Sequence, residues 1–213
     1  RLSNEEILKR SGEAEEQGAT EICLQGGLFP GMLLEDYCQI LEVIHRDHPR
    51  LHLHAYSPME VLHMSRNSDL AVEDCLKELK RSGLGSMPGT AAEILVDSIR
   101  QVICPEKLKT EEWKEIITTA HHLKIPSTST ILFGHVERME DRLEHLEILK
   151  GIQNQTGGFT ELVLLPFIPE NNPLGKAVRG ADLLDRLKMH ALARVALYPA
   201  ITNIQASWTK LGR

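Results

Sequence analysis

The sequence predicts an α/β protein, a partial parallel βα barrel of about six strands. Three observations support this: predicted helices and strands alternate along the chain, the strands recur about every 36 residues, and several strands carry one polar face. That repeat is the length of a strand plus its crossover helix, which implies a parallel sheet. A closed eight-stranded barrel takes about 250 residues, more than the 213 present, so we expect an incomplete barrel.

Local signals justify each element. Ser3 and Glu6 form a capping box that opens the first helix, and Gly18 ends it. Further helices are expected where apolar residues recur at helical spacing, and strands where short apolar or alternating runs end at Gly or Pro. The expected helices cover 3–17, 34–45, 58–64, 70–81, 110–123, 139–155 and 181–197. The expected strands cover 20–24, 51–56, 84–87, 127–133, 160–165 and 201–206.

The strand faces favour a barrel over a doubly wound open sheet. In an open sheet helices cover both faces, so the strands read as continuous Val, Ile and Leu. Here 51–56 alternates between apolar and polar residues, 127–130 is Ser-Thr-Ser-Thr, and no GxGxxG or GxxxxGK(S/T) motif follows a strand. The residues expected to point into a partly wet interior are His52, His54 and Tyr56, and those expected to face helices are Leu51, Leu53 and Ala55.

Composition excludes several classes of protein. The 24 Lys and Arg against 30 Asp and Glu give a net charge of −6, whereas nucleic-acid-binding surfaces usually carry a basic excess. The hydrophobic fraction of 42% suits a folded chain. The longest apolar run, 162–168, contains a proline and is far shorter than the roughly 20 residues that span a membrane. Four cysteines without a CxxC pair predict reduced thiols and a cytoplasmic protein.

The candidate site follows from the barrel. Catalytic and binding residues of a βα barrel lie at the C-terminal ends of the strands and in the loops that follow. That rule selects the segments 25–27, 56–57, 86–90, 130–135 and 205–208. Gly26 and Gly27 allow a backbone to approach a ligand closely, because no Cβ intervenes, although a plain turn explains them equally well.

Several residues allow two interpretations. His52 and His54 are either a metal-binding pair, as in metal-dependent hydrolase barrels, or are hydrogen-bonded to neighbouring strands. Glu93 follows a Pro-Gly-Thr turn, where it either accepts hydrogen bonds from ribose hydroxyls or is a solvated helix-start carboxylate. His135 either contacts a ligand or caps the next helix. The charged run 137–147 is expected to be a solvated helix face.

Six segments together carry a family resemblance: LQGGLFP (24–30), LHLHAYSPMEV (51–61), SMPGTAAEIL (86–95), STSTILFGHVE (127–137), TGGFTELVLLPFIP (156–169) and NIQASW (203–208). With them the chain resembles the radical S-adenosylmethionine (radical SAM) enzymes that make deazaflavin and menaquinone precursors, and most closely the CofH type found in FO synthase. The likeness covers essentially the whole chain. It implies a partial TIM-like barrel of the radical SAM type, with 1–213 in one core domain.

The resemblance also implies a chemistry. It implies a 4Fe–4S cluster, S-adenosylmethionine, and a transferase that joins the 4-hydroxybenzyl group of L-tyrosine to 5-amino-6-(D-ribitylamino)uracil. A reductant protein and a CofG-type second radical SAM subunit or domain are the implied partners. The family's CxxxCxxC motif, which holds the cluster, is absent here, since no cysteines have that spacing. The resemblance places the motif shortly before Ser3. We therefore expect a fragment that lacks its first strand, its cluster loop and its C-terminal portion, and that is inactive by itself.

The resemblance assigns binding residues but no catalytic residue and no metal ligand. For S-adenosylmethionine, the matching residues are Gln25, Gly26 and Gly27 near the methionine amino group, Ser86 and Glu93 near the ribose and carboxylate, and Thr130, Gly134 and His135 near the adenine. For the substrates, the matching residues are His54, Tyr56, Gln205 and Ser207.

Three alternatives stay open on the sequence. The first is a relative of menaquinone biosynthesis, an aminofutalosine synthase or a cyclic dehypoxanthine futalosine synthase. The second is a metal-dependent hydrolase using His52 and His54. The third is a non-catalytic subunit that lost its cluster. Because the chain opens at Arg1, a lost organellar targeting segment also stays open beside the cytoplasmic expectation.

Overall fold

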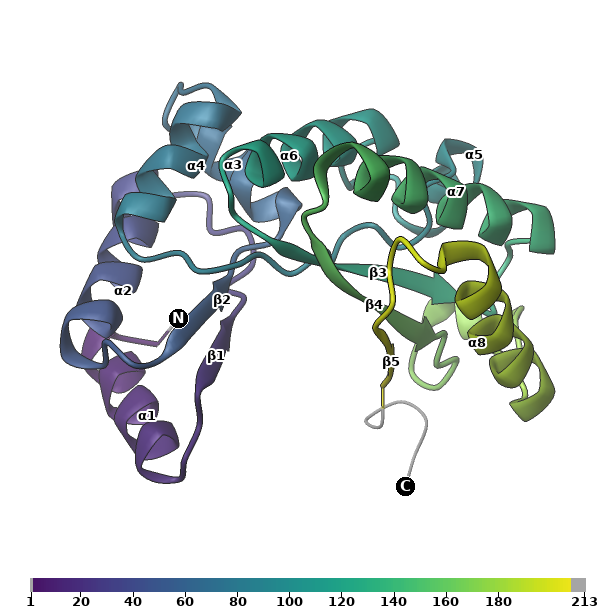
Figure 1. Cartoon of the computed structure of the whole chain (residues 1–213), viewed down its shortest axis with the longest axis horizontal. Coiled ribbons are helices and arrows are strands. Elements are labelled where there is room, and N and C mark those ends of the chain that lie inside the picture. The colour runs from purple at the N-terminus through teal and green to yellow at the C-terminus, as the bar shows by residue number, and fades with distance from the viewer. Residues whose placement is uncertain (1, 208–213) are drawn as a thin grey trace. The chain divides into compact units, whose positions relative to one another are not determined.

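The computed structural model describes residues 2–207, which divide into two compact units: 2–88 with 119–126, and 89–118 with 127–207. Helices and parallel strands alternate within both units (Figure 1). The α/β class with parallel strands is therefore confirmed. Trp208, at the end of the last predicted site segment, lies outside the described residues.

The first unit has a parallel pair of strands, β1 (Glu21–Leu24) and β2 (His52–Ala55). Its helices are α1 (Asn4–Glu16), α2 (Leu34–Asp47), α3 (Pro58–Asn67) and α4 (Val72–Arg81). The expected strand at 84–87 is reduced to two bridge residues, Ser86 and Met87, and Ser86 pairs with His54 of β2. Capping boxes open α1 and α3, and Pro58 occupies the first turn of α3, where its missing N–H costs nothing.

Strand β2 follows the predicted alternation as far as Ala55. Leu51, Leu53 and Ala55 are buried, while the rings of His52 and His54 both reach the Ser86 hydroxyl and so share one face. Tyr56 does not continue that row.

Tyr56 lies instead against helix α2. Its φ is 60°, its ring meets that of Tyr37 edge to face with centroids 5.4 Å apart, and its hydroxyl donates to the Tyr37 carbonyl. The expectation that Tyr56 points inward beside the histidines is wrong, because its left-handed backbone breaks the period-two pattern.

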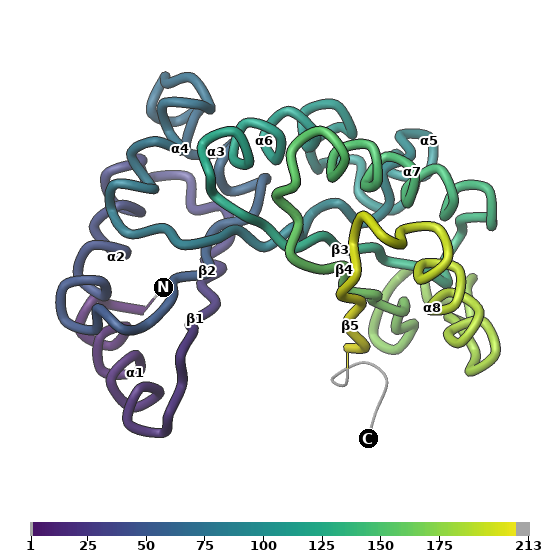
Figure 2. The backbone as a smooth tube through the Cα atoms, viewed as in Figure 1, coloured from purple at the N-terminus to yellow at the C-terminus, as the bar shows by residue number. Residues whose placement is uncertain are grey.

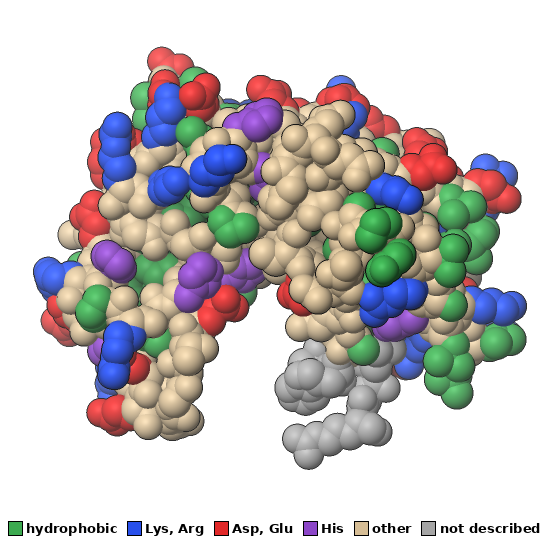
Figure 3. All heavy atoms as spheres, viewed as in Figure 1, with side chains coloured by type: hydrophobic (Ala, Val, Ile, Leu, Met, Phe, Trp, Pro, Cys, Tyr) green, Lys and Arg blue, Asp and Glu red, His purple; other side chains and the backbone are tan. Residues whose placement is uncertain are grey.

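The second unit has a three-stranded parallel sheet in the order β3 (Ser127–Phe133), β4 (Phe159–Pro166), β5 (Ile204–Ala206) (Figure 2). Helix α7 (Met139–Thr156) contacts β3, and α8 (Leu183–Leu197) contacts β4 and β5. A short 3-10 helix, Pro173–Lys176, follows β4. Helix α6 (Thr110–His122) crosses the boundary between the units after Thr118. Several apolar side chains of α8 are exposed, among them Leu183, Leu187 and Val195 (Figure 3).

The segment between Gly89 and α5 (Asp97–Ile103) is a loop. Buried Arg100 organises it, because its guanidinium donates to the backbone carbonyls of Ala91, Ala92, Ile94 and Leu108. Glu93 lies in this loop with a φ of 45°. The interpretation of Glu93 as a helix-start residue is therefore wrong.

Each unit has its own apolar core. Leu41, Ile44 and Leu76 are fully buried in the first unit, and Trp113 and Phe133 in the second. Trp113 stacks on Phe159 with ring centroids 6.4 Å apart. No helix in residues 2–207 is both long enough and apolar enough to cross a membrane.

Candidate functional site

The first candidate subsite lies in the first unit, at the end of β1. The turn Gln25–Gly27 follows that strand directly, and Gly27 has a φ of 71°, a conformation that glycine adopts without strain. A cavity of about 350 Å³ is lined by Gln25, Gly26, Gly27 and Tyr56, among other residues. The structure therefore brings four of the predicted site residues to one cavity.

A buried carboxylate holds this turn. The Gly26 and Gly27 amides both donate to Oε1 of Glu60, over 2.8 and 3.2 Å. Glu60 lies at the start of α3. Sequence reasoning missed it, although the Ser57-x-x-Glu60 pattern repeats the capping-box signal that is present at Ser3 and Glu6.

The histidine pair lies in the same unit as this subsite. Nε2 of His52 and Nδ1 of His54 each lie 2.7 Å from Oγ of Ser86. Burial lowers the pKa of His54, which favours its neutral form. A hydroxyl has one proton to donate and can also accept, so Ser86 links the two imidazoles. Among residues 2–207, no group of three or more His, Cys, Asp or Glu is placed to hold a metal ion.

The second candidate subsite is a cavity of about 460 Å³ in the second unit. Glu93 and His135 both line it, together with Lys107 and Phe167. Nζ of Lys107 lies 2.6 Å from Oε1 of Glu93, and the Leu132 amide donates to the Glu93 carbonyl. The end of β3 and the loop of Glu93 therefore lie side by side in the lining of this cavity.

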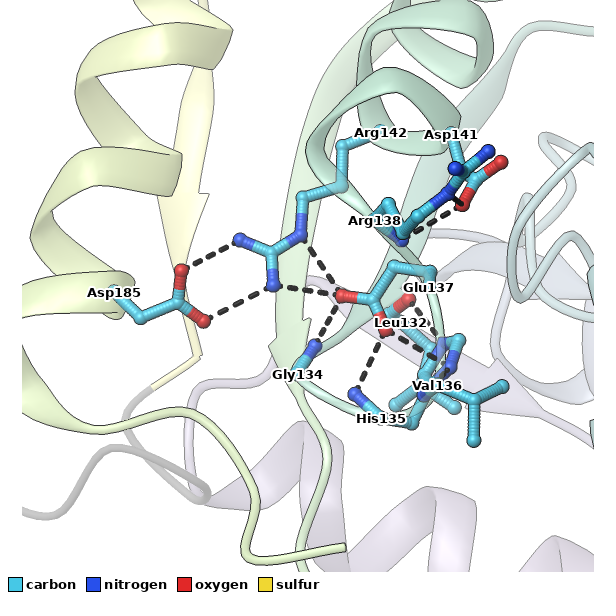
Figure 4. Close-up of polar contacts among 9 residues, drawn as sticks. All are labelled: Leu132, Gly134, His135, Val136, Glu137, Arg138, Asp141, Arg142 and Asp185. Atoms are coloured by element: carbon cyan, nitrogen blue, oxygen red, sulfur yellow. Dashed lines mark hydrogen bonds and ion pairs between the residues drawn. The ribbon is translucent and has the colours of Figure 1, made fainter.

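Residues Gly134 to Glu137 form a polar turn (Figure 4), and His135 of this turn lines that cavity. The Glu137 carboxylate accepts from the amides of Gly134 and His135, over 2.5 and 2.8 Å, and from Arg142 Nε over 2.8 Å. Burial alone would raise the pKa of Glu137, but contacts with His135 and Gly134 outweigh it and lower the pKa to about 2. The turn therefore carries a carboxylate that is ionised at neutral pH.

Arg142 connects this turn to helix α8. Its guanidinium makes two hydrogen bonds to Asp185, of 2.7 and 3.0 Å (Figure 4), and lies 5.3 Å from the centre of the Phe133 ring. The prediction of a solvated face over 137–147 is wrong at Glu137, Arg142 and His145, which are buried. No local signal marks this network, because Asp185 lies 43 residues from Arg142 in the sequence.

The other predicted residues lie apart from the two cavities. Oγ1 of Thr130 donates to the Gly89 carbonyl over 2.8 Å, so this buried side chain ties β3 to the loop of Glu93. Gln205 is exposed on β5, paired in register with Val163, and Ser207 is half-buried just beyond that strand.

The cysteines in the described residues do not form a cluster site. All four thiols are free. Burial raises the pKa of Cys75 to about 12 and also raises the pKa values of Cys38 and Cys104. A 4Fe–4S cluster needs several thiolates close together, and no group of three or more possible metal ligands occurs among residues 2–207, so these cysteines do not fit such a cluster.

Comparison with known proteins identifies related families. The Radical SAM superfamily matches residues 1–149. The chain is 55% identical, over its whole length and 62% of the relative, to the 5-amino-6-(D-ribitylamino)uracil–L-tyrosine 4-hydroxyphenyl transferase of Archaeoglobus fulgidus. It is 51% identical to the enzyme of the same name from Methanothermobacter thermautotrophicus, over 99% of this chain and 58% of the relative. The chain thus spans about three fifths of the length of these relatives.

Solved structures share the fold. Methylornithine synthase (PylB) superposes with a TM-score of 0.68 at 14% identity, covering 100% of this chain and 64% of that one. The archaeal Elp3 of Methanocaldococcus infernus superposes with a TM-score of 0.66 at 12% identity, covering 96% of this chain and 51% of that one. These likenesses confirm the predicted fold class, a partial TIM-like barrel of the radical SAM type.

Proposed function

Because the chain belongs to the radical SAM superfamily, we propose that the whole protein joins the 4-hydroxybenzyl group of L-tyrosine to 5-amino-6-(D-ribitylamino)uracil. The observation that carries this proposal is the 55% identity to a transferase named for these two substrates, over the entire chain. The superfamily match extends over 1–149, and we take all of 1–213 to be part of one core domain.

The superfamily implies a 4Fe–4S cluster and S-adenosylmethionine, which together supply radical chemistry when bound. The described residues do not supply cluster ligands, so no step through the cluster is assigned to them. We propose that they contribute to binding S-adenosylmethionine, because each part of that molecule needs donors or acceptors of a kind found among the predicted site residues of one unit or the other. An ammonium group needs acceptors, a ribose diol needs a carboxylate or amide, and an adenine needs an apolar wall with polar edges.

Each cavity has a proposed role. The turn Gln25–Gly27 binds the methionine amino group, and Ser86 lies near that end of the ligand. Glu93 accepts hydrogen bonds from the ribose hydroxyls: a carboxylate can accept several at once, so its bond with Lys107 leaves capacity for a ligand. Gly134 and His135, supported by Thr130, bound the adenine. His54, Tyr56, Gln205 and Ser207 are the proposed substrate contacts.

Partners follow from the same proposal. A reductant protein supplies electrons to the cluster, and a CofG-type radical SAM subunit or domain uses the product in the same pathway. We further propose that the protein acts in the cytoplasm, without a nucleic-acid or membrane partner.

One anaerobic assay tests the proposed reaction. Full-length protein with reconstituted cluster is incubated with a reductant, S-adenosylmethionine, ring-labelled L-tyrosine and 5-amino-6-(D-ribitylamino)uracil. We expect an adduct whose mass contains the labelled hydroxybenzyl group, and none when tyrosine is omitted. Turnover of a menaquinone-pathway substrate instead, with no labelled adduct, would assign the protein to that branch of the family.

A further inference from the structure

We propose that Glu60 is a positioning residue that sets the Gly26–Gly27 turn to receive the ammonium group of S-adenosylmethionine. This inference rests on the proposed function, because it names the ligand that the turn would meet. Glu60 lies outside the residues that line the cavity. It would therefore act through the turn and would not touch the ligand itself.

The geometry gives the two oxygens of Glu60 different partners. Oε1 accepts from the amides of Gly26 and Gly27, over 2.8 and 3.2 Å. Oε2 accepts from the amide and the hydroxyl of Ser57, over 2.8 and 2.7 Å. The residue is only 3% exposed, and its two bonds from Ser57 are buried while its two bonds from the glycine amides are part-buried. Hydrogen bonds to a carboxylate that is shielded from water are strong.

The bonds to Oε1 decide what the turn can offer a ligand. With both glycine amides occupied, the polar groups that Gly26 and Gly27 themselves leave to a ligand are carbonyl oxygens, which only accept hydrogen bonds. The negative charge of Glu60 behind the turn also favours a cation over an anion at that position. An ammonium group satisfies both conditions, whereas a carboxylate or phosphate meets neither.

A capping role alone does not explain this arrangement. Glu6 occupies the same position of the capping box of α1, where one oxygen bonds to the Ser3 amide, and the residue is exposed. A capping glutamate therefore needs neither burial nor bonds to residues outside its own helix start. The bonds that Gly26 and Gly27 donate to Glu60 span 34 and 33 residues of sequence and go beyond what capping requires.

The chain itself suggests a variant that separates the two roles. Asp36 and Asp141 occupy the equivalent position of α2 and α7, and each accepts from the backbone amide three residues before it, over 2.9 and 2.7 Å. Glu60→Asp should therefore retain the bond to the Ser57 amide. Its side chain is one methylene shorter and should not reach the glycine amides. Glu6→Asp is the matched control, with the same change in the other capping box.

Hydrogen exchange in the full-length protein tests the positioning role without any ligand. In Glu60→Asp, we expect the peptide 24–28 to exchange roughly 10- to 150-fold faster, the loss expected for charge-assisted hydrogen bonds, while peptide 58–67 keeps its protection. Glu6→Asp should leave peptide 24–28 unchanged. Should Glu60→Asp fail to fold, the unmodified protein still tests the proposal: the Gly26 and Gly27 amides must exchange slowly although both residues are exposed. Exchange at the unstructured rate would overturn the proposal.

Titration of the cluster-loaded protein with S-adenosylmethionine tests the link to the ligand. We expect Glu60→Asp to raise Kd roughly 10- to 150-fold and Glu6→Asp to leave it unchanged. Equal affinity in Glu60→Asp and the unmodified protein would reject the proposal and leave the proposed function intact. Absence of binding by the unmodified protein would instead reject the proposed function.

Discussion

Nζ of Lys107 lies 2.6 Å from Oε1 of Glu93. The two residues line the same cavity as His135. Glu93 therefore faces a lysine from a loop and does not begin a helix. This pair, held by a loop whose carbonyls bind Arg100, is the basis of the first prediction.

Glu93→Gln should weaken binding of S-adenosylmethionine by roughly 10- to 150-fold, because one charge-assisted hydrogen bond to the ribose is lost. Calorimetric titration of the full-length, cluster-loaded protein measures this. Glu111→Gln is the matched control, since Glu111 forms a comparable 2.7 Å pair with Lys114 outside the cavity. Unchanged affinity in Glu93→Gln would remove Glu93 from the site.

Glu137→Gln should destabilise the protein by about 3 kcal/mol at pH 7, since the pKa of Glu137 is lowered from 4.5 to about 2. A lowered carboxyl pKa stabilises the fold above pH 4.5, and that contribution disappears as the pH falls toward 2. The difference between variant and parent should therefore shrink below pH 4.5. Urea unfolding at several pH values measures it, with exposed Glu144→Gln as control. A difference independent of pH would contradict the assignment.

Gly134→Ala should destabilise the protein by about 1–3 kcal/mol. Gly134 has a φ of 86°, and a Cβ would lie 2.7 Å from the backbone nitrogen and Cβ of Ala181. Gly151→Ala provides the contrast, because Gly151 lies inside α7 with no atom within 4 Å of an added Cβ. Alanine there should stabilise the helix by about 0.5–1 kcal/mol. Thermal unfolding of both variants checks that the two changes in stability have opposite signs. Equal stability of the two variants would contradict the close approach of Gly134 to Ala181.

Buried His145 should make the protein less stable on acidification below pH 6.5. Burial lowers its pKa from 6.5 to about 3, and its Nδ1 accepts from the Leu95 amide. Between these values the unfolded chain binds a proton that the folded protein excludes, so stability rises with pH, by at most about 1.4 kcal/mol per pH unit. His145→Gln should flatten this slope in urea unfolding between pH 5 and 6.5, and exposed His122→Gln should not. An equal pH dependence of the unfolding free energy in both variants would show that groups other than His145 cause it.

Much of the fold is predictable because its signals are local. The capping boxes at Ser3 and Ser57 lie where α1 and α3 begin, and the glycines after β1 form the expected turn. The sequence could not show that the strand expected at 84–87 is reduced to two bridge residues, because strand length depends on how far a neighbouring strand continues.

The candidate site is only partly predictable, because local signals mark some of its residues and distant contacts position the others. Gln25 to Gly27, Glu93 and His135 do line cavities, since strand ends and glycine turns are visible in a sequence. Lys107 and Glu60 were missed, because an ion pair or a carboxylate behind a turn depends on segments that are distant along the chain.

The sequence by itself determined the alternation of strand and helix, the parallel class and the family resemblance, because periodicity and motifs are properties of neighbouring residues. Tertiary structure alone decided that Tyr56 packs on α2, that Arg100 keeps the Glu93 segment in a loop, and that Arg142 is buried between Glu137 and Asp185. The physical reason is burial: a charged or polar group leaves water only where partners from distant segments satisfy it. Those partners meet only in the folded chain.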